Sequence, residues 1–330
     1  MGIHQRKLYE IIEGANILTL SEESREAIIE GMLYPQDYIL LVAEEKVGKT
    51  VYVQQLACSL TSGIPFLNCF EIPKPQNVWL FLTEGKCDDI KDRFVRMKHK
   101  VELDVSRLKL IPTFFRFNTN EGLSCLWELI ARYKDTPEKP NVIIIDALYR
   151  AVKGSIKNDD VINEFHHIMG ILFQQFECAI ILVHHMTKPM KTPEGKHFDR
   201  SDKDTFGSTF LPAGVDHMFW LEKWKKDLSF TKDRMLKCDT QRAGNIVTNI
   251  RLRLHEPDPL FFELISLHTE EKKKVLGILK ESGKKMNLTE LMLKTDIGRS
   301  VLYIVLKELL ETELITKEGM KEKWFQIRNR

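Results

Sequence analysis

The stretch that decides the fold lies near the start of the chain and reads Tyr38-Ile-Leu-Leu-Val-Ala-Glu-Glu-Lys-Val-Gly-Lys-Thr-Val51. Its apolar beginning, residues 38–42, predicts a buried strand, and the apolar positions after the loop predict a helix: Val53, Leu56, Ala57 and Leu60. The loop matches the Walker A pattern G-x-x-x-x-G-K-[ST], except that Ala43 holds the first position. The sequence therefore predicts a strand, a phosphate-binding loop and a helix.

Such a loop suits ATP and Mg²⁺, because backbone N–H groups at a helix N-terminus hold phosphate oxygens. Lys49 would reach the β and γ phosphates, and Thr50 would ligate Mg²⁺. Ala43 would be strained if the first position needs a positive φ. In the alternative interpretation, Gly48-Lys49-Thr50 merely begins a helix. The predicted nucleotide contacts are Glu45, Lys46, Val47, Gly48, Lys49 and Thr50.

Composition sets wide bounds. The chain has 330 residues and a formal net charge of +2, so about two domains fit and any nucleic-acid site must be local. Its six cysteines form no C-x-x-C pair, which argues against a disulfide framework or a zinc module. No apolar run reaches the roughly 18 residues of a membrane span, and the start lacks a signal-type apolar core. We expect a cytoplasmic protein.

Three further apolar runs end in polar residues. The run 77–83 is followed by Glu84, the run 141–145 ends in Asp146, and the run 178–183 ends in His184-His185. Helical patterns at 123–133 and 159–176 alternate with these runs, which predicts an α/β fold with a mostly parallel sheet and helices on both faces. Ligands bind at the carboxyl edge of such sheets, so these side chains should meet the phosphate loop there. Asp146 would then ligate Mg²⁺ with Thr50.

Each of these residues has an alternative interpretation. Glu84 could be an ordinary acid at a strand end that caps the following helix, and Asp146 alone would decide nothing. The pair His184-His185 could be one packed and one exposed histidine, or half of a metal site shared with His166-His167.

The remaining chain divides into three parts. Residues 1–37 predict lead-in helices, one of them at 22–32, and the α/β domain spans 38–266 with later strands at 215–221, 235–239 and 247–254. Residues 267–330 predict a winged-helix domain, because three helical patterns precede a hairpin. The helices are expected at 270–281, 288–294 and 298–311, and the hairpin strands at 314–319 and 323–327.

Basic residues in two loops and in one helix are candidates for nucleic-acid contacts. Backbone contacts by such side chains would depend on salt and little on sequence. A solvated loop at 186–207 is the alternative for the loop lysines, and protein contacts are the alternative for the winged helix. The candidates are Lys153, Lys157, Lys188, Lys191, Lys196 and Arg200 in the loops, and Arg299, Ser300, Tyr303 and Lys307 in the helix.

The order of these motifs resembles that of RepA-type plasmid helicases, a group of the RecA/DnaB-like ATPases. The resemblance covers about residues 27–255 and rests on the phosphate loop, Thr83-Glu84, residues 144–148, 183–188, 206–208 and 241–244. It implies a RecA-like core that hydrolyses ATP as a DNA translocase or helicase, assembled as a hexameric ring, in replication of a plasmid or mobile element.

The resemblance also implies roles for single residues. Glu84 would polarise the attacking water, His185 would sense the γ-phosphate, and Arg242 would reach the nucleotide of a neighbouring subunit. With Lys49 and Asp146 these are the expected catalytic residues. Two departures stand out: Ala43 replaces the first loop glycine, and Thr240 stands where relatives often have lysine.

A rival function is an ATP-gated DNA-binding regulator that uses the winged helix and does not unwind DNA. A small-molecule kinase is disfavoured, because the sequence has neither an arginine-rich lid nor an acceptor-pocket pattern.

Overall fold

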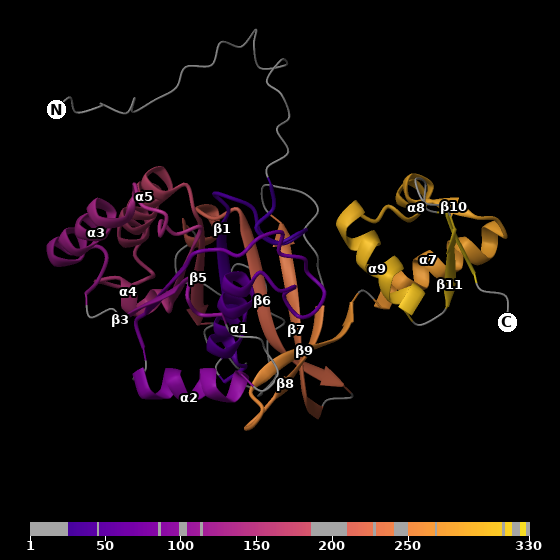
Figure 1. The fold of residues 1–330 in the computed structure, drawn as a ribbon, viewed down its shortest axis with the longest axis horizontal. Coiled ribbons are helices and arrows are strands. Elements are labelled where there is room, and N and C mark those ends of the chain that lie inside the picture. Colours follow the sequence, from indigo (N-terminus) through magenta and orange to yellow (C-terminus); the bar gives the residue numbers. More distant parts are fainter. Residues whose placement is uncertain are drawn as a thin grey trace, which may run out of the picture.

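The structure is a computed structural model of the 330-residue chain, shown as a ribbon in Figure 1. It describes residues 26–44, 46–84, 87–98, 104–112, 115–185, 210–226, 229–240, 250–267, 269–311, 314–318 and 324–327. No helix within these residues is long and apolar enough to cross a membrane.

The described residues build one nine-stranded sheet in the order β3-β2-β4-β5-β1-β6-β7-β8-β9. From β3 to β6 all neighbours are parallel, and from β6 to β9 they are antiparallel. The mostly parallel sheet is as predicted. Its strands are β1 (Tyr38–Ala43), β2 (Val78–Leu82), β3 (Leu108–Pro112), β4 (Val142–Asp146), β5 (Ala179–His185), β6 (His217–Lys226), β7 (Ser229–Thr240), β8 (Ile250–His255) and β9 (Phe261–Leu267).

Helices cover both faces of this sheet, as predicted. Alternate residues of a strand point to opposite faces, so Ile39 and Leu41 of β1 join one apolar cluster while Leu40 and Val42 join another. The first cluster includes side chains of α1 and α2, and the second includes those of α3 and α5. The helices are α1 (Lys49–Ser62), α2 (Cys87–Met97), α3 (Asn120–Tyr133), α4 (Leu148–Ala151), α5 (Asp159–Phe176) and α6 (Phe210–Ala213).

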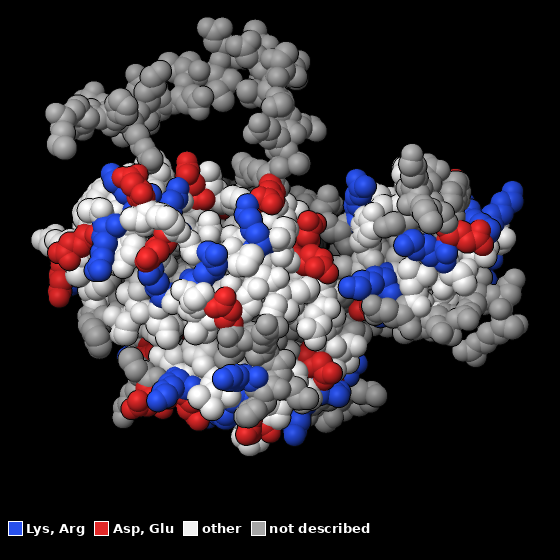
Figure 2. Space-filling model, in the orientation of Figure 1, with Lys and Arg blue, Asp and Glu red and all other residues white. Residues whose placement is uncertain are grey.

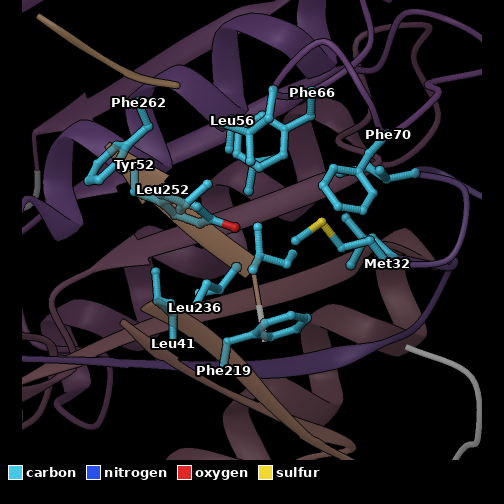
Figure 3. Packing of buried hydrophobic residues seen from close by; sticks show 14 of the residues in the cluster. Met32, Leu41, Tyr52, Leu56, Phe66, Phe70, Phe219, Leu236, Leu252 and Phe262 are labelled. Carbon is cyan, nitrogen blue, oxygen red and sulfur yellow. The ribbon is translucent and has the colours of Figure 1, made fainter. Parts of the chain in front are cut away.

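The central strands are apolar along their whole length because both of their faces are buried. All six residues of β1 and all five of β4 are buried. Figure 3 shows how Leu41 of β1 and Phe219 of β6 lie in one cluster with Tyr52 and Leu56 of α1. The cluster on the α1 face therefore attaches the helix after the phosphate loop to the strand before it.

The helix predicted at residues 22–32 is wrong for its described part. Residues 26–37 form turns, in which the amides of Ile28 and Ile29 both donate to the carbonyl of Leu33 and Gly31 has a φ of 69°. Ile28, Ile29, Met32 and Leu33 are all buried in the cluster on the α1 face. Their spacing imitates one face of a helix, but a tight turn at a left-handed glycine brings them to the sheet instead.

The later strands form where apolar patterns predict them, with one addition. Strand β9 was not predicted, because Phe261–Leu267 lies against the expected domain boundary. Gln55 of α1 fixes it, since the Gln55 amide donates to the Phe262 carbonyl (2.9 Å) and its oxygen accepts from the Phe262 amide (2.6 Å).

The elements after β9 follow the predicted order of three helices and a hairpin, and they lie beside the β7–β9 end of the sheet (Figure 1). They are α7 (Thr269–Ser282), β10 (Met286–Asn287), α8 (Leu288–Thr295), α9 (Arg299–Glu311), β11 (Ile315–Glu318) and β12 (Trp324–Ile327). The strands form a small antiparallel sheet in the order β10-β12-β11. The assignment of residues 267–330 as a separate winged-helix domain stays a prediction.

A matched pair of valine substitutions tests the core. Val53→Ala in α1 removes a side chain with no exposed surface, whereas Val95→Ala in α2 removes one that is 53% exposed. Both positions are helical, so the gain in helix propensity is the same. We expect Val53→Ala to lower the free energy of unfolding by about 2 kcal/mol and Val95→Ala by less than about 0.5 kcal/mol, measured by denaturant titration. Equal losses would contradict the packing described.

Candidate functional site

The phosphate loop leaves the carboxyl end of β1 and enters α1. Ala43, at the first position of the pattern, is still part of β1 and pairs with His185 of β5 and Leu221 of β6. Its φ is not positive, whereas Lys46 and Gly48 have φ values of 58° and 100°. An extended backbone accepts alanine, so the departure from the glycine pattern at Ala43 causes no strain in this loop.

Gly48, the residue before α1, is held close to the antiparallel strands. A Cβ at this position would lie 2.9 Å from Cζ of Phe262 in β9 and 3.0 Å from Cδ2 of Leu254 in β8. Gly48 is thus required both by its φ and by the close approach of two side chains.

The parallel register brings the predicted site residues to one edge. Leu82 of β2 pairs with Asp146 of β4, Asp146 pairs with Val183 of β5, and Ala43 of β1 pairs with His185. Glu84 follows β2 by two residues. Glu84, Asp146, His185 and the loop residue Lys49 therefore share the carboxyl edge, as predicted from the strand ends.

His185 lies between the predicted phosphate-binding lysine and the predicted base. Nζ of Lys49 is 3.0 Å from Nδ1 of His185, and Nε2 of the same ring is 3.6 Å from Oε1 of Glu84. Because a lysine ammonium only donates, Nδ1 accepts and Nε2 carries the hydrogen of the neutral ring. The imidazole thus connects the phosphate loop to Glu84 across three elements of the fold.

Asp146 is buried next to the start of α1. Burial raises the pKa of its carboxyl, while the hydrogen bond with Thr50 and the charges of Lys49 and Arg93 lower it. A hydroxyl and a carboxylate in contact are the hard oxygen ligands that Mg²⁺ takes beside phosphate oxygens and water. The pair Thr50 and Asp146 therefore fits the predicted magnesium ligands.

His184 points away from this chemistry. Its side chain is 1% exposed, and burial, with the charges of His185 and Lys49, lowers its pKa to about 4. His166 of α5, its suggested metal partner, instead contacts the Tyr38 hydroxyl (3.0 Å) and the Phe210 carbonyl (3.2 Å). Among the described residues no group of three or more His, Cys, Asp or Glu side chains could hold a metal ion, so the histidine metal site is not supported.

Sequence reasoning missed four residues around the site. Arg93 of α2 acts on Asp146 by its charge, and Tyr149 and Arg150 of α4 approach Glu84. Arg234 of β7 is 6% exposed, and its Nε donates to the carbonyl of Val47 in the phosphate loop (3.0 Å). Arg93 and Arg234 are isolated in sequence and carry no signal. Tyr149 and Arg150 could have been suspected, because they follow Asp146 within four positions.

The predicted nucleic-acid residues are scattered. Lys153 and Lys157, after α4, are exposed. Figure 2 shows Lys and Arg interspersed with Asp and Glu over the face in view, so this face has no large patch of one sign. Several predicted residues, Glu45, Arg242, Lys188, Lys191, Lys196 and Arg200, lie outside the described residues.

The exposed side chains of α9 face the α/β part of the chain. Arg299, Tyr303 and Lys307 line a groove of about 670 Å³ whose other wall includes Glu30 and Glu71. Ser300 lies on the same helix, and nothing describes its side chain. An acidic wall opposite the predicted recognition face is unfavourable for a phosphate backbone in the groove as it stands.

The mostly parallel sheet, with a phosphate loop between β1 and α1, defines a RecA-like P-loop ATPase fold. A family model described as "AAA domain" matches residues 13–191, more than half of the chain. The chain belongs to this AAA-domain family. A search of curated proteins finds no match.

Solved structures of similar fold share little sequence with this chain. One of them, an ATPase domain, has a TM-score of 0.51 at 12% identity, and the match covers 71% of this chain and 86% of that one. A KaiC-like protein from Pyrococcus horikoshii OT3 has a TM-score of 0.49 at 12% identity, covering 73% and 99%. The flagellar accessory protein FlaH from Methanocaldococcus jannaschii has a TM-score of 0.43 at 14% identity, covering 72% and 91%.

Replacing Gly48 should disturb the loop more than replacing a glycine in open space. Gly48→Ala adds a strained φ and a clash with Phe262, whereas Gly283→Ala adds only strain, because nothing lies within 4 Å of a Cβ there. We expect Gly48→Ala to lower the free energy of unfolding by about 2–3 kcal/mol and Gly283→Ala by about 1 kcal/mol. Binding of a non-hydrolysable ATP analogue, measured by calorimetry, should weaken only for Gly48→Ala. Equal costs would argue against the close approach.

The burial of neutral His184 predicts a pH dependence of stability. Its folded-state pKa of about 4 lies below the ordinary 6.5, so the unfolded chain binds the proton first as the pH falls. Stability should therefore decline below pH 6.5 and lose at most about 3 kcal/mol by pH 4. Denaturant titrations across this range should show a flatter dependence for His184→Gln. Parallel curves for the two proteins would contradict this.

Proposed function

We propose that the protein hydrolyses ATP and uses the energy to move along DNA as a translocase or helicase of the RepA type. The observation that carries the proposal is the contact of His185 with both Lys49 and Glu84. A group between the phosphate-binding lysine and the water-activating carboxylate can report on the γ-phosphate to the base.

The roles of the chain's own groups follow from their positions. The loop amides and Lys49 bind the phosphates, and Glu84 orients and deprotonates the attacking water. His185, which already contacts Lys49, exchanges that contact for the γ-phosphate when ATP binds. Thr50 and Asp146 hold Mg²⁺, which neutralises charge on the phosphates when it is bound.

Assembly completes the proposed site. Arg242 follows β7, which ends at Thr240, and acts on the nucleotide of a neighbouring subunit in a hexameric ring. A trans arginine contributes about 10³–10⁵ in rate, so hydrolysis should be slow in isolated subunits. Single-stranded DNA is the proposed track, with Lys153, Lys157 and the lysines of residues 186–207 as backbone contacts. The biological role is replication of a plasmid or mobile element.

A second candidate is an ATP-gated DNA-binding regulator that does not unwind DNA. The exposed Arg299, Tyr303 and Lys307 on α9 favour it, because they are the side chains with which a recognition helix would meet duplex DNA. Strand displacement separates the two candidates, since the regulator binds duplex sites and displaces nothing.

The first experiment measures ATP hydrolysis with and without single-stranded DNA over a range of protein concentrations, with Lys49→Ala as the blank. The motor proposal expects stimulation of at least about tenfold and a specific rate that rises with concentration, because Arg242 acts between subunits. Hydrolysis that is indifferent to DNA and concentration would favour the regulator. Turnover by Lys49→Ala equal to that of the wild type would overturn the site itself.

Glu84→Gln tests the proposed base with little change in shape. We expect nucleotide affinity to stay within about twofold while turnover falls by about 10²–10⁴, because the amide cannot accept the water proton. Affinity is measured by calorimetry with a non-hydrolysable analogue and turnover by phosphate release. Normal turnover would remove Glu84 from its role.

A further inference from the structure

Tyr149 and Arg150 lie on α4, immediately after the strand that carries Asp146, and both reach Glu84. The Tyr149 hydroxyl is hydrogen-bonded to the Glu84 carboxylate. Nε of Arg150 lies 3.0 Å from the Tyr149 hydroxyl oxygen and 3.8 Å from Oε1 of Glu84. Glu84 is therefore contacted by His185 and by this pair.

The direction of these hydrogen bonds follows from the chemistry of the groups. A guanidinium has donors only, so Arg150 donates and the Tyr149 oxygen accepts. The single phenolic hydrogen is then left for the carboxylate, which accepts when ionised. The order is Arg150 to Tyr149 to Glu84, and each bond polarises the next.

The backbones that carry Glu84 and Tyr149 are joined. The Thr83 hydroxyl donates to the Ala147 carbonyl (2.9 Å) and accepts from the Ala147 amide (2.7 Å). The Thr83 amide also donates to the Asp146 carbonyl (2.9 Å). Thr83 precedes Glu84, and Ala147 is two residues before Tyr149, so the hydroxyl and the carboxylate are held at a fixed separation.

Tyr149 also contacts the other partner of Glu84. Its ring packs edge-on against the His185 imidazole, with centroids 5.2 Å apart and an interplanar angle of 71°. Leu148 and Ala151, on the same short helix, have no exposed surface and anchor it in the core. One side chain on a fixed helix thus restrains both the predicted base and the predicted sensor.

We propose that Tyr149 is a positioning residue of the hydrolytic site, with its hydroxyl holding the Glu84 carboxylate and Arg150 orienting that hydroxyl. The inference rests on the proposed function, because it assigns Tyr149 to the reaction in which Glu84 activates water. It adds a second restraint on the base besides His185. Small errors in the position of a reacting group are costly, so this restraint acts on turnover rather than on nucleotide binding.

Tyr149→Phe is the sharpest test, because it removes the hydroxyl and leaves the ring against His185. We expect kcat to fall about 10- to 100-fold, as for loss of a hydrogen bond to a charged group, with KM and analogue affinity within about twofold. Tyr133→Phe on α3 is the matched control and should leave kcat unchanged. Arg150→Met should lower kcat less than Tyr149→Phe, because it removes only the group that orients the hydroxyl.

A double variant separates positioning from general destabilisation. If Tyr149 acts through Glu84, adding Tyr149→Phe to Glu84→Gln should lower the residual single-turnover rate by less than about twofold. A full additional loss of about 10-fold, a parallel loss of nucleotide affinity, or an unchanged kcat in Tyr149→Phe would each overturn the proposal.

These outcomes differ from failure of the proposed function. If the wild type hydrolyses no ATP above the Lys49→Ala blank, the proposed function fails and the role of Tyr149 with it. If wild-type turnover is normal and Tyr149→Phe retains it, only the role of Tyr149 fails.

Discussion

The pairing of β1 with β5 is the constraint on which the site depends. This parallel ladder aligns Ala43 with His185, so the loop that leaves β1 begins beside the ring that ends β5. Lys49 then lies 3.0 Å from that ring. A shift by one residue would turn His185 to the other face of the sheet and break the connection to Glu84. Burial of β1 on both faces makes such a shift costly, because it would exchange the apolar side chains of two packed layers.

The antiparallel strands support the loop from behind. Arg234 donates to the Val47 carbonyl, Gln55 holds the backbone of Phe262, and Gly48 lies against Phe262 and Leu254. Arg234 itself has lost much of its hydration, and burial lowers the pKa of its guanidinium. A buried cation is retained where hydrogen bonds replace water, and here its acceptors are backbone carbonyls, including those of Lys232 (2.9 Å) and Asp233 (3.1 Å). Strands β7–β9 thus set the shape of the loop without contributing to its motif.

Much of the arrangement could be read from residue order. The apolar runs and the loop pattern determined the parallel strands, the helices between them and the carboxyl edge where Glu84, Asp146 and His185 meet, since these signals are local and periodic. The turn at residues 28–33 could not be distinguished from a helix, because both bury side chains at the same spacing and the choice depends on packing against the sheet. Strand β9 was hidden for the same reason, as Gln55 and the neighbouring β8 decide its place.

Only the tertiary structure decided how those residues act on one another. It placed Arg234, isolated in sequence, against the loop, left Ala43 in an unstrained strand, and directed α9 toward Glu30 and Glu71. The sequence by itself determined which chemical groups exist and at which strand ends they stand, because those follow from backbone periodicity. Which groups touch was decided by the register of strands far apart in the chain, because a long-range contact leaves no local pattern.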